Sequence, residues 1–343
     1  MNNIMRTDVV NQAHRMMRRL DEAWPEAACL MHDDALAALD GWPEVQVRRV
    51  PDDPATMRCS VAGGYVHSTI PPTLTVTESL SPRRQQFTAL HELGHHLQKS
   101  DARLALAVRR QRGDRERFED ACCDMFASLV LIPDADLPPR TAGRSPSAAD
   151  VVGLFERTQA SRAPCCVRIA DQLGTHGAVA ILDATGTVSF AVGHGEVIPP
   201  ARGSSQVRTP LVSTALRTGR DTRVDDTYLQ YRNGSTSGLL YGDAAWAGDY
   251  LIVVTVLDRA GWKPFAPPRT ATQNFVPRIW ICEICGEEFT PDETCGRCRA
   301  PRCGSGHCPC TSVGERQCSH CFQRLAPSRF PSRTSPLCRD CAD

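Results

Sequence analysis

The sequence predicts an α+β protein in which several units follow one another along 343 residues. Apolar residues recur at a helical period through much of the first half, and a strand-like period replaces it after residue 175. Eleven of the 17 cysteines lie between Cys282 and Cys341, where other apolar residues are scarce. Bound metal must therefore replace a hydrophobic core in that last part.

These changes of pattern divide the chain into five predicted parts. They are an α+β domain at 1–140 with its core at about 40–140, a helical, helix-turn-helix-like segment at 141–175, a small α/β sensor-like or docking module at 176–265, a linker at 266–278, and a cysteine-rich zinc-binding domain at 279–343. A chain of this length is long enough for two or three such domains to have cores of their own.

In the first domain, residues 6–38 alternate apolar and polar groups at helical spacing and predict one or two helices. Met57–His67 and Leu74–Thr77 predict strands, since both segments are rich in Val, Tyr and Thr. A helix is expected to begin at Ser81-Pro82, because Ser is a favoured N-cap and Pro a favoured first helical residue. A second helix is expected over Arg115–Leu131, before Pro133.

Farther along, Ser145–Leu173 contains two short amphipathic stretches that resemble a helix-turn-helix. Strands are predicted at Ala178–Asp183, Val188–Val192 and Tyr250–Asp258. Between them, Pro199–Asp249 is polar and Gly-rich and has no clear period. The remaining six cysteines are expected to be small core residues rather than reactive thiols; they are Cys29, Cys59, Cys122, Cys123, Cys165 and Cys166.

Composition excludes some functions. Lys plus Arg equals Asp plus Glu at 39 each, so no global basic field collects nucleic acid. No apolar run approaches the roughly 20 residues of a membrane span, and the N-terminus lacks the apolar core of a secretory signal. We therefore expect a cytoplasmic protein with no membrane partner, in which clustered cysteines bind metal rather than form disulfides.

The segment His91-Glu92-Leu93-Gly94-His95 predicts a catalytic zinc site. Residues four apart share one face of a helix, so His91 and His95 can direct two imidazole nitrogens at one ion. Glu92 lies beside that face, where it can take a proton from the attacking water and pass it to the leaving amine. A chance pattern on a surface helix is the alternative, and the apolar stripe of the predicted helix disfavours it. His96 faces another direction and is expected to be solvated or to support a ligand.

A catalytic zinc ion takes three protein ligands and keeps one position open. The next predicted helix supplies the carboxylates Glu119, Asp120 and Asp124. Asp124 stands one turn after Asp120 and is suited to orient a histidine through its free ring N–H. Glu119 lies nearer the apolar side of this helix, and both it and Asp120 can alternatively be solvated charges of a helix N-terminus.

The stretch Leu80–His96 (LSPRRQQFTALHELGHH), with Phe-Ala-x-Leu-x-Leu-x-Pro ending at Pro133, resembles the ImmA/IrrE family of bacterial metallopeptidases. The resemblance covers roughly residues 45–135 and implies a zincin-like fold with one catalytic Zn²⁺. It also implies that a glutamate six residues before the Phe of the Phe-Ala pair is the third ligand. Asp120 occupies that register here, so the third ligand is predicted to be Asp120, with Glu119 as the alternative. Relatives can also carry a GAF-like module, which residues 176–265 fit loosely.

The cysteine-rich tail predicts two or three structural Zn²⁺ ions. Two Cys-x-x-Cys pairs separated by nine residues have zinc-ribbon spacing, and two more are separated by sixteen. The first set is Cys282, Cys285, Cys295 and Cys298, and the second is Cys318, Cys321, Cys338 and Cys341. Between the two sets lie Cys303, His307, Cys308 and Cys310. These four either hold a third ion or exchange partners with the first set in a cross-braced arrangement.

The sequence thus predicts a zinc-dependent intracellular endopeptidase with a protein substrate. The resemblance implies that this substrate is a helix-turn-helix transcriptional repressor, whose cleavage switches on stress-response or mobile-element genes. The alternative is a DNA-binding or protein-binding regulator in which the peptidase fold is a scaffold and the zinc ribbons carry the function. Nucleic acid would then bind through the tail or the helix-turn-helix-like segment, although both have nearly balanced charge.

Overall fold

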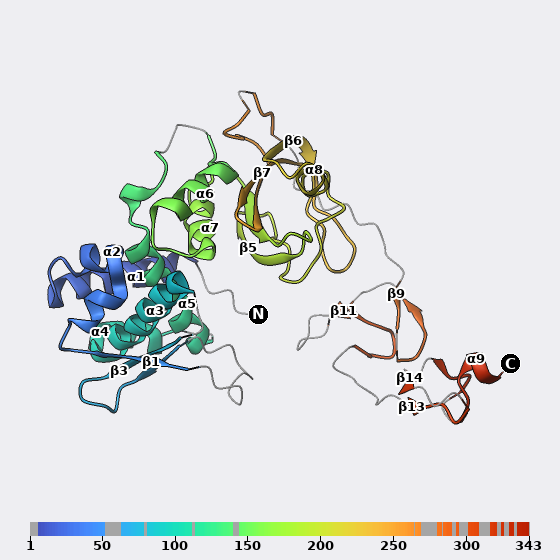
Figure 1. Cartoon of the computed structure of the whole chain (residues 1–343), viewed down its shortest axis with the longest axis horizontal. Helices are drawn as coiled ribbons and strands as arrows, with labels where there is room; N and C mark the ends of the chain where they lie inside the picture. The colour runs from blue at the N-terminus through green and yellow to red at the C-terminus, as the bar shows by residue number, and fades with distance from the viewer. Residues whose placement is uncertain are drawn as a thin grey trace.

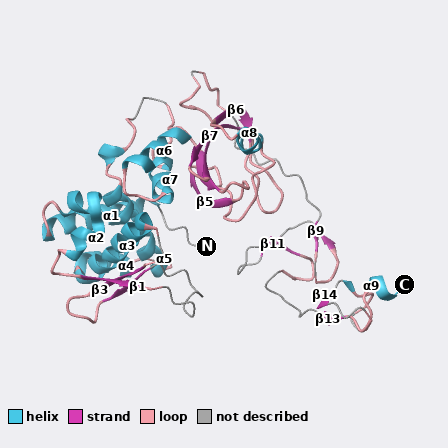
Figure 2. Cartoon of the chain, in the orientation of Figure 1, coloured by secondary structure: helices cyan, strands magenta, loops and turns pink. Residues whose placement is uncertain are grey.

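The computed structural model divides into a helical part, a sheet-containing part and a small tail (Figures 1 and 2). The described residues are 6–51, 63–78, 81–111, 114–139, 144–263, 265–268, 280–282, 284–289, 293–294, 301–308, 316–320, 324–325, 329–332 and 335–342. None of the helices among these residues is long and apolar enough to cross a membrane.

Five helices and a small sheet form the first part. The helices are α1 (Arg6–Ala23), α2 (Ala27–Asp40), α3 (Pro82–Ser100), α4 (Ala102–Arg109) and α5 (Arg115–Leu131). The strands β1 (Gln46–Val50), β2 (Gly63–Val66) and β3 (Thr73–Thr77) lie in the order β1-β3-β2, with β1 parallel and β2 antiparallel to β3. Among the described strands, β2 is therefore an edge strand of this sheet.

The two predicted helices that carry the candidate site are present, and local sequence explains their limits. Ser81 precedes α3 with Pro82 at the first helical position. Asp114 caps α5 by accepting a hydrogen bond from the N–H of Arg117 at 3.0 Å. A short helix, α4, lies between them and was not predicted. Its N-cap is Asp101, which accepts from the N–H groups of Arg103 and Leu104.

The second part is a five-stranded antiparallel sheet with helices on both faces. Its helices are α6 (Ala148–Arg157), α7 (Arg162–Ala170) and α8 (Pro210–Thr218), and its strands are β4 (Gly177–Leu182), β5 (Val188–His194), β6 (Thr222–Thr227), β7 (Leu240–Ala247) and β8 (Tyr250–Val256). The strand order is β5-β4-β8-β7-β6. Helices α6 and α7 contact one face, and the apolar side of α8 packs with residues of the other. Every residue of β4 is buried, as expected for a strand covered on both faces.

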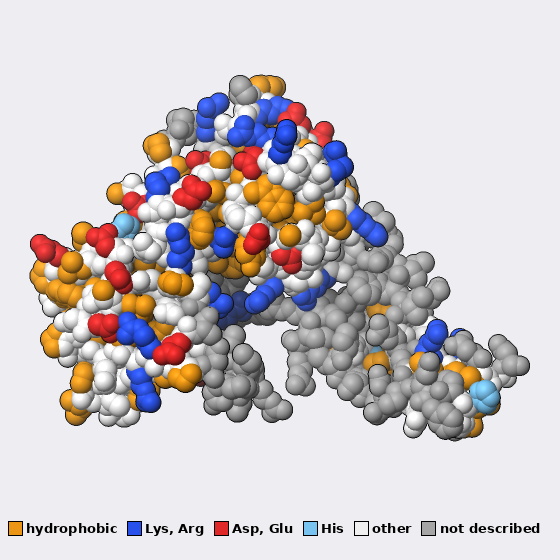
Figure 3. Space-filling model, viewed as in Figure 1, with side chains coloured by type: hydrophobic (Ala, Val, Ile, Leu, Met, Phe, Trp, Pro, Cys, Tyr) orange, Lys and Arg blue, Asp and Glu red, His pale blue; other side chains and the backbone are white. Residues whose placement is uncertain are grey.

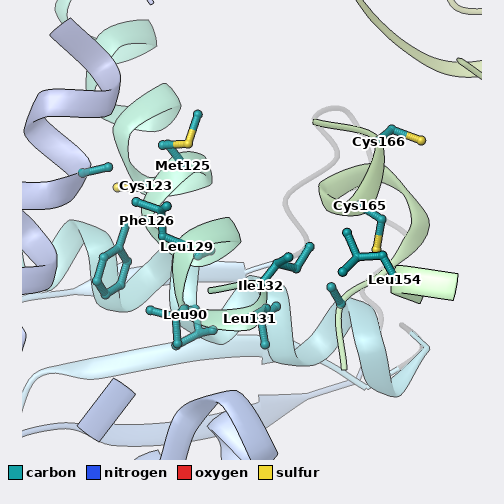
Figure 4. Close-up of a cluster of buried hydrophobic side chains, with 14 of the residues drawn as sticks. Leu90, Cys123, Met125, Phe126, Leu129, Leu131, Ile132, Leu154, Cys165 and Cys166 are labelled. Atoms are coloured by element: carbon teal, nitrogen blue, oxygen red, sulfur yellow. The ribbon is translucent and has the colours of Figure 1, made fainter. Parts of the chain in front are cut away.

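Helices α6 and α7 form the predicted helix pair, but they serve packing. The second helix, α7, buries six of its nine residues against α5 and strands β4 and β5. One continuous set of buried side chains runs from Val9 in α1 to Val256 in β8. Figure 4 shows Ile132, at the end of α5, pointing toward Leu154 of α6 and Cys165 of α7. The first part and one face of the large sheet therefore share a core.

Within the described residues of the tail, the regular elements are two-residue strands and one helical turn. The strands are β9 (Trp280–Ile281), β10 (Glu288–Phe289), β11 (Glu293–Thr294), β12 (Pro301–Arg302), β13 (Arg316–Gln317) and β14 (Arg324–Leu325), and the helix is α9 (Arg339–Ala342). They pair as three antiparallel ladders, β9 with β10, β11 with β12, and β13 with β14. A small buried cluster contains Cys318, Cys338 and Phe330.

The structure corrects several expectations. The stretch Pro199–Asp249 has regular elements, α8, β6 and β7, which its Gly-rich, polar composition concealed. Strand β1 was also not predicted. Cys29 is exposed rather than buried, because it lies on the outer side of α2, whereas Cys122, Cys123, Cys165 and Cys166 are buried as expected. Cys59 lies outside the described residues.

The surface carries both signs of charge. Figure 3 shows Lys and Arg side chains interspersed with Asp and Glu over the visible face of the first two parts. This mixture agrees with the equal totals of basic and acidic residues.

Candidate metal centre and cleft

Helices α3 and α5 lie close together because one residue of α3 has no side chain. A Cβ atom built on Gly94 would stand 2.9 Å from the Sγ and 3.1 Å from the Cα of Cys123 in α5. The glycine of the His-Glu-Leu-Gly-His segment therefore sets how closely α5 approaches α3. This approach brings the carboxylates of α5 to the histidines of α3.

The two histidine rings present the same atom to one point. His91 Nε2 and His95 Nε2 are 3.2 Å apart, and the side chains are 20% and 15% exposed. Two nitrogens that bind one tetrahedral zinc ion at 2.0–2.1 Å stand about 3.3 Å apart. The observed separation thus fits two ligands of one zinc ion, as the four-residue spacing predicted.

The carboxylates of α5 separate into two kinds of position. Asp124 Oδ1 lies 2.8 Å from His91 Nδ1, and Glu119 Oε1 lies 2.8 Å from His95 Nδ1. Asp120 Oδ1 instead lies 3.4 Å from His95 Nε2, on the side where the two Nε2 atoms meet. Asp124 and Glu119 therefore accept hydrogen bonds from the Nδ1 atoms, whereas Asp120 lies near the Nε2 atom of His95.

Cys123 also comes within 4.8 Å of ring nitrogens of His91 and His95. Burial raises the pKa of this thiol well above its usual value. Gln98 Nε2 also donates to this sulfur at 3.2 Å. Cys123 and Asp120 are thus the candidate third donors beside the two histidines.

Burial and neighbouring charges shift the pKa values of the groups around these donors. Burial raises the pKa of Glu92, and the neighbouring His91 and His95 offset part of the rise. The hydrogen bond with His95 lowers the pKa of Glu119. Burial lowers the pKa of His91, but Asp124, Glu92 and Asp120 outweigh it, and the net change is upward.

Glu92 lies against the edge strand β2. A Cβ atom on Gly63 would stand 2.9 Å from Glu92 Oε1 and 2.4 Å from Thr88 Cγ2, so a side chain at position 63 would displace the carboxylate. Tyr65 lies two residues farther along β2, and its hydroxyl is 3.2 Å from His96 Nδ1. His96 is buried, with its ring edge-on to Trp42 and Tyr65, rather than solvated.

These groups open into a cleft of about 1140 Å³. One wall consists of β2, α3 and α5, with Tyr65, Glu92 and Asp120 among its residues. The opposite wall includes Ala163, Pro164 and Val167 of α7, and Phe190 of β5. The sequence offered no signal for this second wall, because its residues lie some 70 to 100 positions from His91 in ordinary apolar patterns.

In the tail, the structure brings two groups of donors together. Cys318, Cys338 and Cys341 form one, as the spacing predicted, and Cys321 lies outside the described residues. The other consists of Cys282, Cys285, Cys303 and His307. Cys308 is buried and is not part of either group. Cys295, Cys298 and Cys310 also lie outside the described residues.

A comparison with protein families gives a match over the residues of α3 and α5. Residues 55–169 match the model of the IrrE N-terminal-like domain, the peptidase M78 family. The chain contains an M78 peptidase domain. This match ends within α7, so the domain includes α6 and most of the helix that lines the second wall of the cleft. It leaves the tail uncovered.

Among solved structures, a Mycobacterium tuberculosis transcriptional regulator is similar at 16% identity and a TM-score of 0.41. The similarity covers 72% of this chain and 75% of that one. No curated protein matches the sequence.

Proposed function

We propose that this chain is a zinc-dependent endopeptidase whose metal is held by His91, His95 and Asp120, with Glu92 as the general base. One observation carries the proposal. His95 Nε2 stands 3.2 Å from His91 Nε2 and 3.4 Å from Asp120 Oδ1, and each of these two separations fits neighbouring donors of one zinc ion. The M78 family match supports it.

Asp124 and Glu119 position the ligands rather than bind the metal. Each accepts a hydrogen bond from an Nδ1 atom, which keeps the proton on Nδ1 and leaves the Nε2 lone pair free. The ring orientations are thus fixed by α5 through two carboxylates. This assigns Glu119 a different role from Asp120, although the two are adjacent in sequence.

Zinc bound at this site would polarise a peptide carbonyl and make water acidic enough to react near neutral pH. Glu92 accepts the proton of the attacking water and then delivers it to the leaving amine. Burial suits this double role, because the raised pKa of Glu92 makes its carboxyl a better proton carrier. Gly63 keeps β2 close enough to hold that carboxylate in place.

A polypeptide segment is the substrate class that the cleft favours. The volume of about 1140 Å³ exceeds that of most small-molecule sites, and β2 lies at its margin as an edge strand among the described strands. An extended peptide can pair with such an edge by main-chain hydrogen bonds. The resemblance to the ImmA/IrrE family suggests a transcriptional repressor as the source of this segment.

Glu92→Gln is the decisive variant. It keeps the size of the side chain but cannot accept a proton, so we expect full zinc content and at least about a 1,000-fold loss of cleavage. The substrate would be a repressor encoded beside the gene, and the product a single cut seen by mass spectrometry. A Glu92→Gln protein that cleaves as fast as the parent would overturn the assignment.

Zinc content distinguishes the two adjacent carboxylates of α5. Asp120→Asn should remove about one zinc equivalent under mild dialysis, whereas Glu119→Gln should weaken zinc binding by only about 10- to 100-fold. Glu116→Gln is the matched control, since Glu116 is an exposed carboxylate in the first turn of the same helix. Equal zinc loss from Asp120→Asn and Glu116→Gln would exclude Asp120 as a ligand.

The alternative function is a regulator in which the tail does the work. The two converging donor groups of the tail favour it, since closed cysteine sites commonly build interaction modules. The same Glu92→Gln variant tests it in cells. A regulator that uses the peptidase fold only as a scaffold would keep full biological activity with this substitution.

A further inference from the structure

Two turns of the tail face each other and present four metal-ligating side chains. Cys282 and Cys285 come from the first turn, and Cys303 and His307 come from the second. The Sγ atoms of Cys285 and Cys303 are 3.8 Å apart. His307 Nδ1 lies 3.6 Å from Cys303 Sγ and 3.9 Å from Cys282 Sγ. All four donor atoms lie within 4.8 Å of one another.

These separations are those of a tetrahedron around zinc. With Zn–S bonds of 2.3 Å, two sulfurs of one tetrahedral site stand about 3.8 Å apart, and a sulfur and a nitrogen stand slightly closer. A disulfide would need sulfurs about 2.05 Å apart, and packing alone does not require four polar donors to converge. The donor set has no position left for water or substrate, as in a structural site.

The backbone of each turn is shaped for this arrangement. The N–H of Gly286 donates to the carbonyl of Cys282 at 2.7 Å, and the N–H of Gly306 donates to that of Cys303 at 2.8 Å. Both glycines have positive φ, 73° and 77°, which a side chain would make costly. The two turns also touch, since Ser305 Oγ donates to Glu287 at 3.4 Å.

We propose that Cys282, Cys285, Cys303 and His307 bind one structural zinc ion as a Cys3His site. The ligand pairs of this site lie on either side of Cys295 and Cys298 in the sequence. The spacing of the cysteines favours the consecutive set Cys282, Cys285, Cys295 and Cys298, which is a different connectivity. Both arrangements use Cys282 and Cys285 and differ in the second pair of ligands.

Zinc counting in the full chain separates them. Each double substitution, Cys282→Ser with Cys285→Ser, or Cys303→Ser with His307→Ala, should remove about one zinc equivalent after dialysis. All four substitutions together should still remove about one, because both pairs hold the same ion. Cys29→Ser, at an exposed cysteine outside both donor groups, is the control and should remove none.

The opposite result overturns the proposal. If the four substitutions together removed about two equivalents, the pairs would belong to different ions.

A conservative variant covers the case in which these substitutions unfold the tail. His307→Cys keeps four donors and adds a thiolate, so the full chain loaded with Co²⁺ should gain thiolate-to-cobalt charge-transfer absorption and its ligand-field bands should move to longer wavelength. Zinc content should not change. An unaltered cobalt spectrum would place His307 outside the metal site and sink the proposal.

Discussion

The proposed metal centre between α3 and α5 and the proposed Cys3His site of the tail use similar donors but hold them in different ways. In the first, two helices of the packed core hold the ligands, and Glu119 and Asp124 fix the ring orientations. In the second, two turns hold them, and the few buried side chains nearby are mostly the cysteines themselves. Packing therefore sets the geometry of the first site, whereas the proposed metal must set that of the second.

Asp120 is 59% exposed at the side chain and lines the cleft, whereas Cys282 and Cys303 of the tail group are 7% and 4% exposed. Cys285 of that group is exposed, so the two sites differ in their open coordination position rather than in exposure alone. An open coordination position admits substrate, but an exposed ligand needs support from neighbouring groups to stay in place. A closed set needs no such support, because the ion itself fills the interior. The comparison teaches that a metal site can be open only where another force holds its ligands.

Metal removal should produce the largest difference between the two sites. Stripping zinc with a strong chelator should unfold the tail, since structural zinc contributes about 10 kcal/mol or more to such modules. The helical part should stay folded on its hydrophobic core. Limited proteolysis followed by mass spectrometry is expected to show new cuts after about residue 280 and none within α3 or α5.

Zinc readdition supplies the control, because it should restore protection of the tail. Cuts inside α3 or α5 that appear as early as those in the tail would contradict the comparison. That outcome would mean that the first centre also depends on its metal for folding.

Gly94→Ala tests whether packing sets the first centre. The new Cβ would meet the side chain and Cα of Cys123 at 2.9–3.1 Å, so α5 must move away. Overpacking of this kind costs about 1–3 kcal/mol. We expect this loss of unfolding free energy in the chelated protein too, together with weaker zinc binding at His91 and His95.

Gly153→Ala is the matched control. Gly153 lies within α6, and the nearest atom to its new Cβ is the end of the flexible Arg157 side chain at 3.0 Å. Helix propensity should therefore make this change neutral or stabilising by up to about 1 kcal/mol. Urea unfolding of both variants measures the difference. A Gly94→Ala protein as stable as Gly153→Ala would show that α5 is not held by this contact.

The same contact explains how much of the site could be predicted. Helical spacing alone places His91 and His95 on one face, so their convergence could be predicted from the sequence. Which carboxylate stands beside Nε2 depends on the rotation and approach of α5, which a contact between distant residues sets. The sequence therefore left Asp120 and Glu119 as alternatives.

The tail shows the same limit in another form. The Cys-x-x-Cys turns were predictable because four residues and a glycine define them locally. The partner of each turn depends on how the turns dock, so spacing left both the consecutive and the exchanged pairing open. The second wall of the cleft could likewise not be predicted, because the packing of the shared core places α7 and β5 there.

Arg83→Ala tests whether α6 and α7, the helices next to the second wall of the cleft, are held in place by α3. The guanidinium donates to the carbonyls of Phe155, Thr158 and Ala160, where α6 ends, and lies over the Phe155 ring. Removing these charged hydrogen bonds should cost about 2 kcal/mol. Arg84→Ala, at the exposed neighbour, should cost less than about 0.5 kcal/mol. Equal urea midpoints would show that α6 and α7 are held independently of α3.

Substitution of Asp34 should have the smallest effect on the free energy of unfolding, and it involves no metal. The backbone of α2 is non-helical at Asp34, and its carboxylate accepts from Gln86 Nε2 at 2.9 Å and from the N–H of Ala37 at 3.0 Å. It thus caps the second half of α2 and connects it to α3. Asp34→Ala should cost about 1 kcal/mol at pH 7, and Asp34→Asn less, because Asn is an equally good cap.

The stability cost of Asp34→Ala should decrease as the pH falls. The hydrogen bond from Gln86, followed by that from Ala37, lowers the pKa of Asp34 below its value of 3.8 in the unfolded chain. The ionised carboxylate therefore stabilises the fold above pH 3.8, and that contribution is lost as the pH falls through the lower folded pKa. The difference between the parent and Asp34→Ala, measured by urea unfolding, should shrink toward pH 3. A constant difference would mean that the charge of Asp34 does not contribute to the cap.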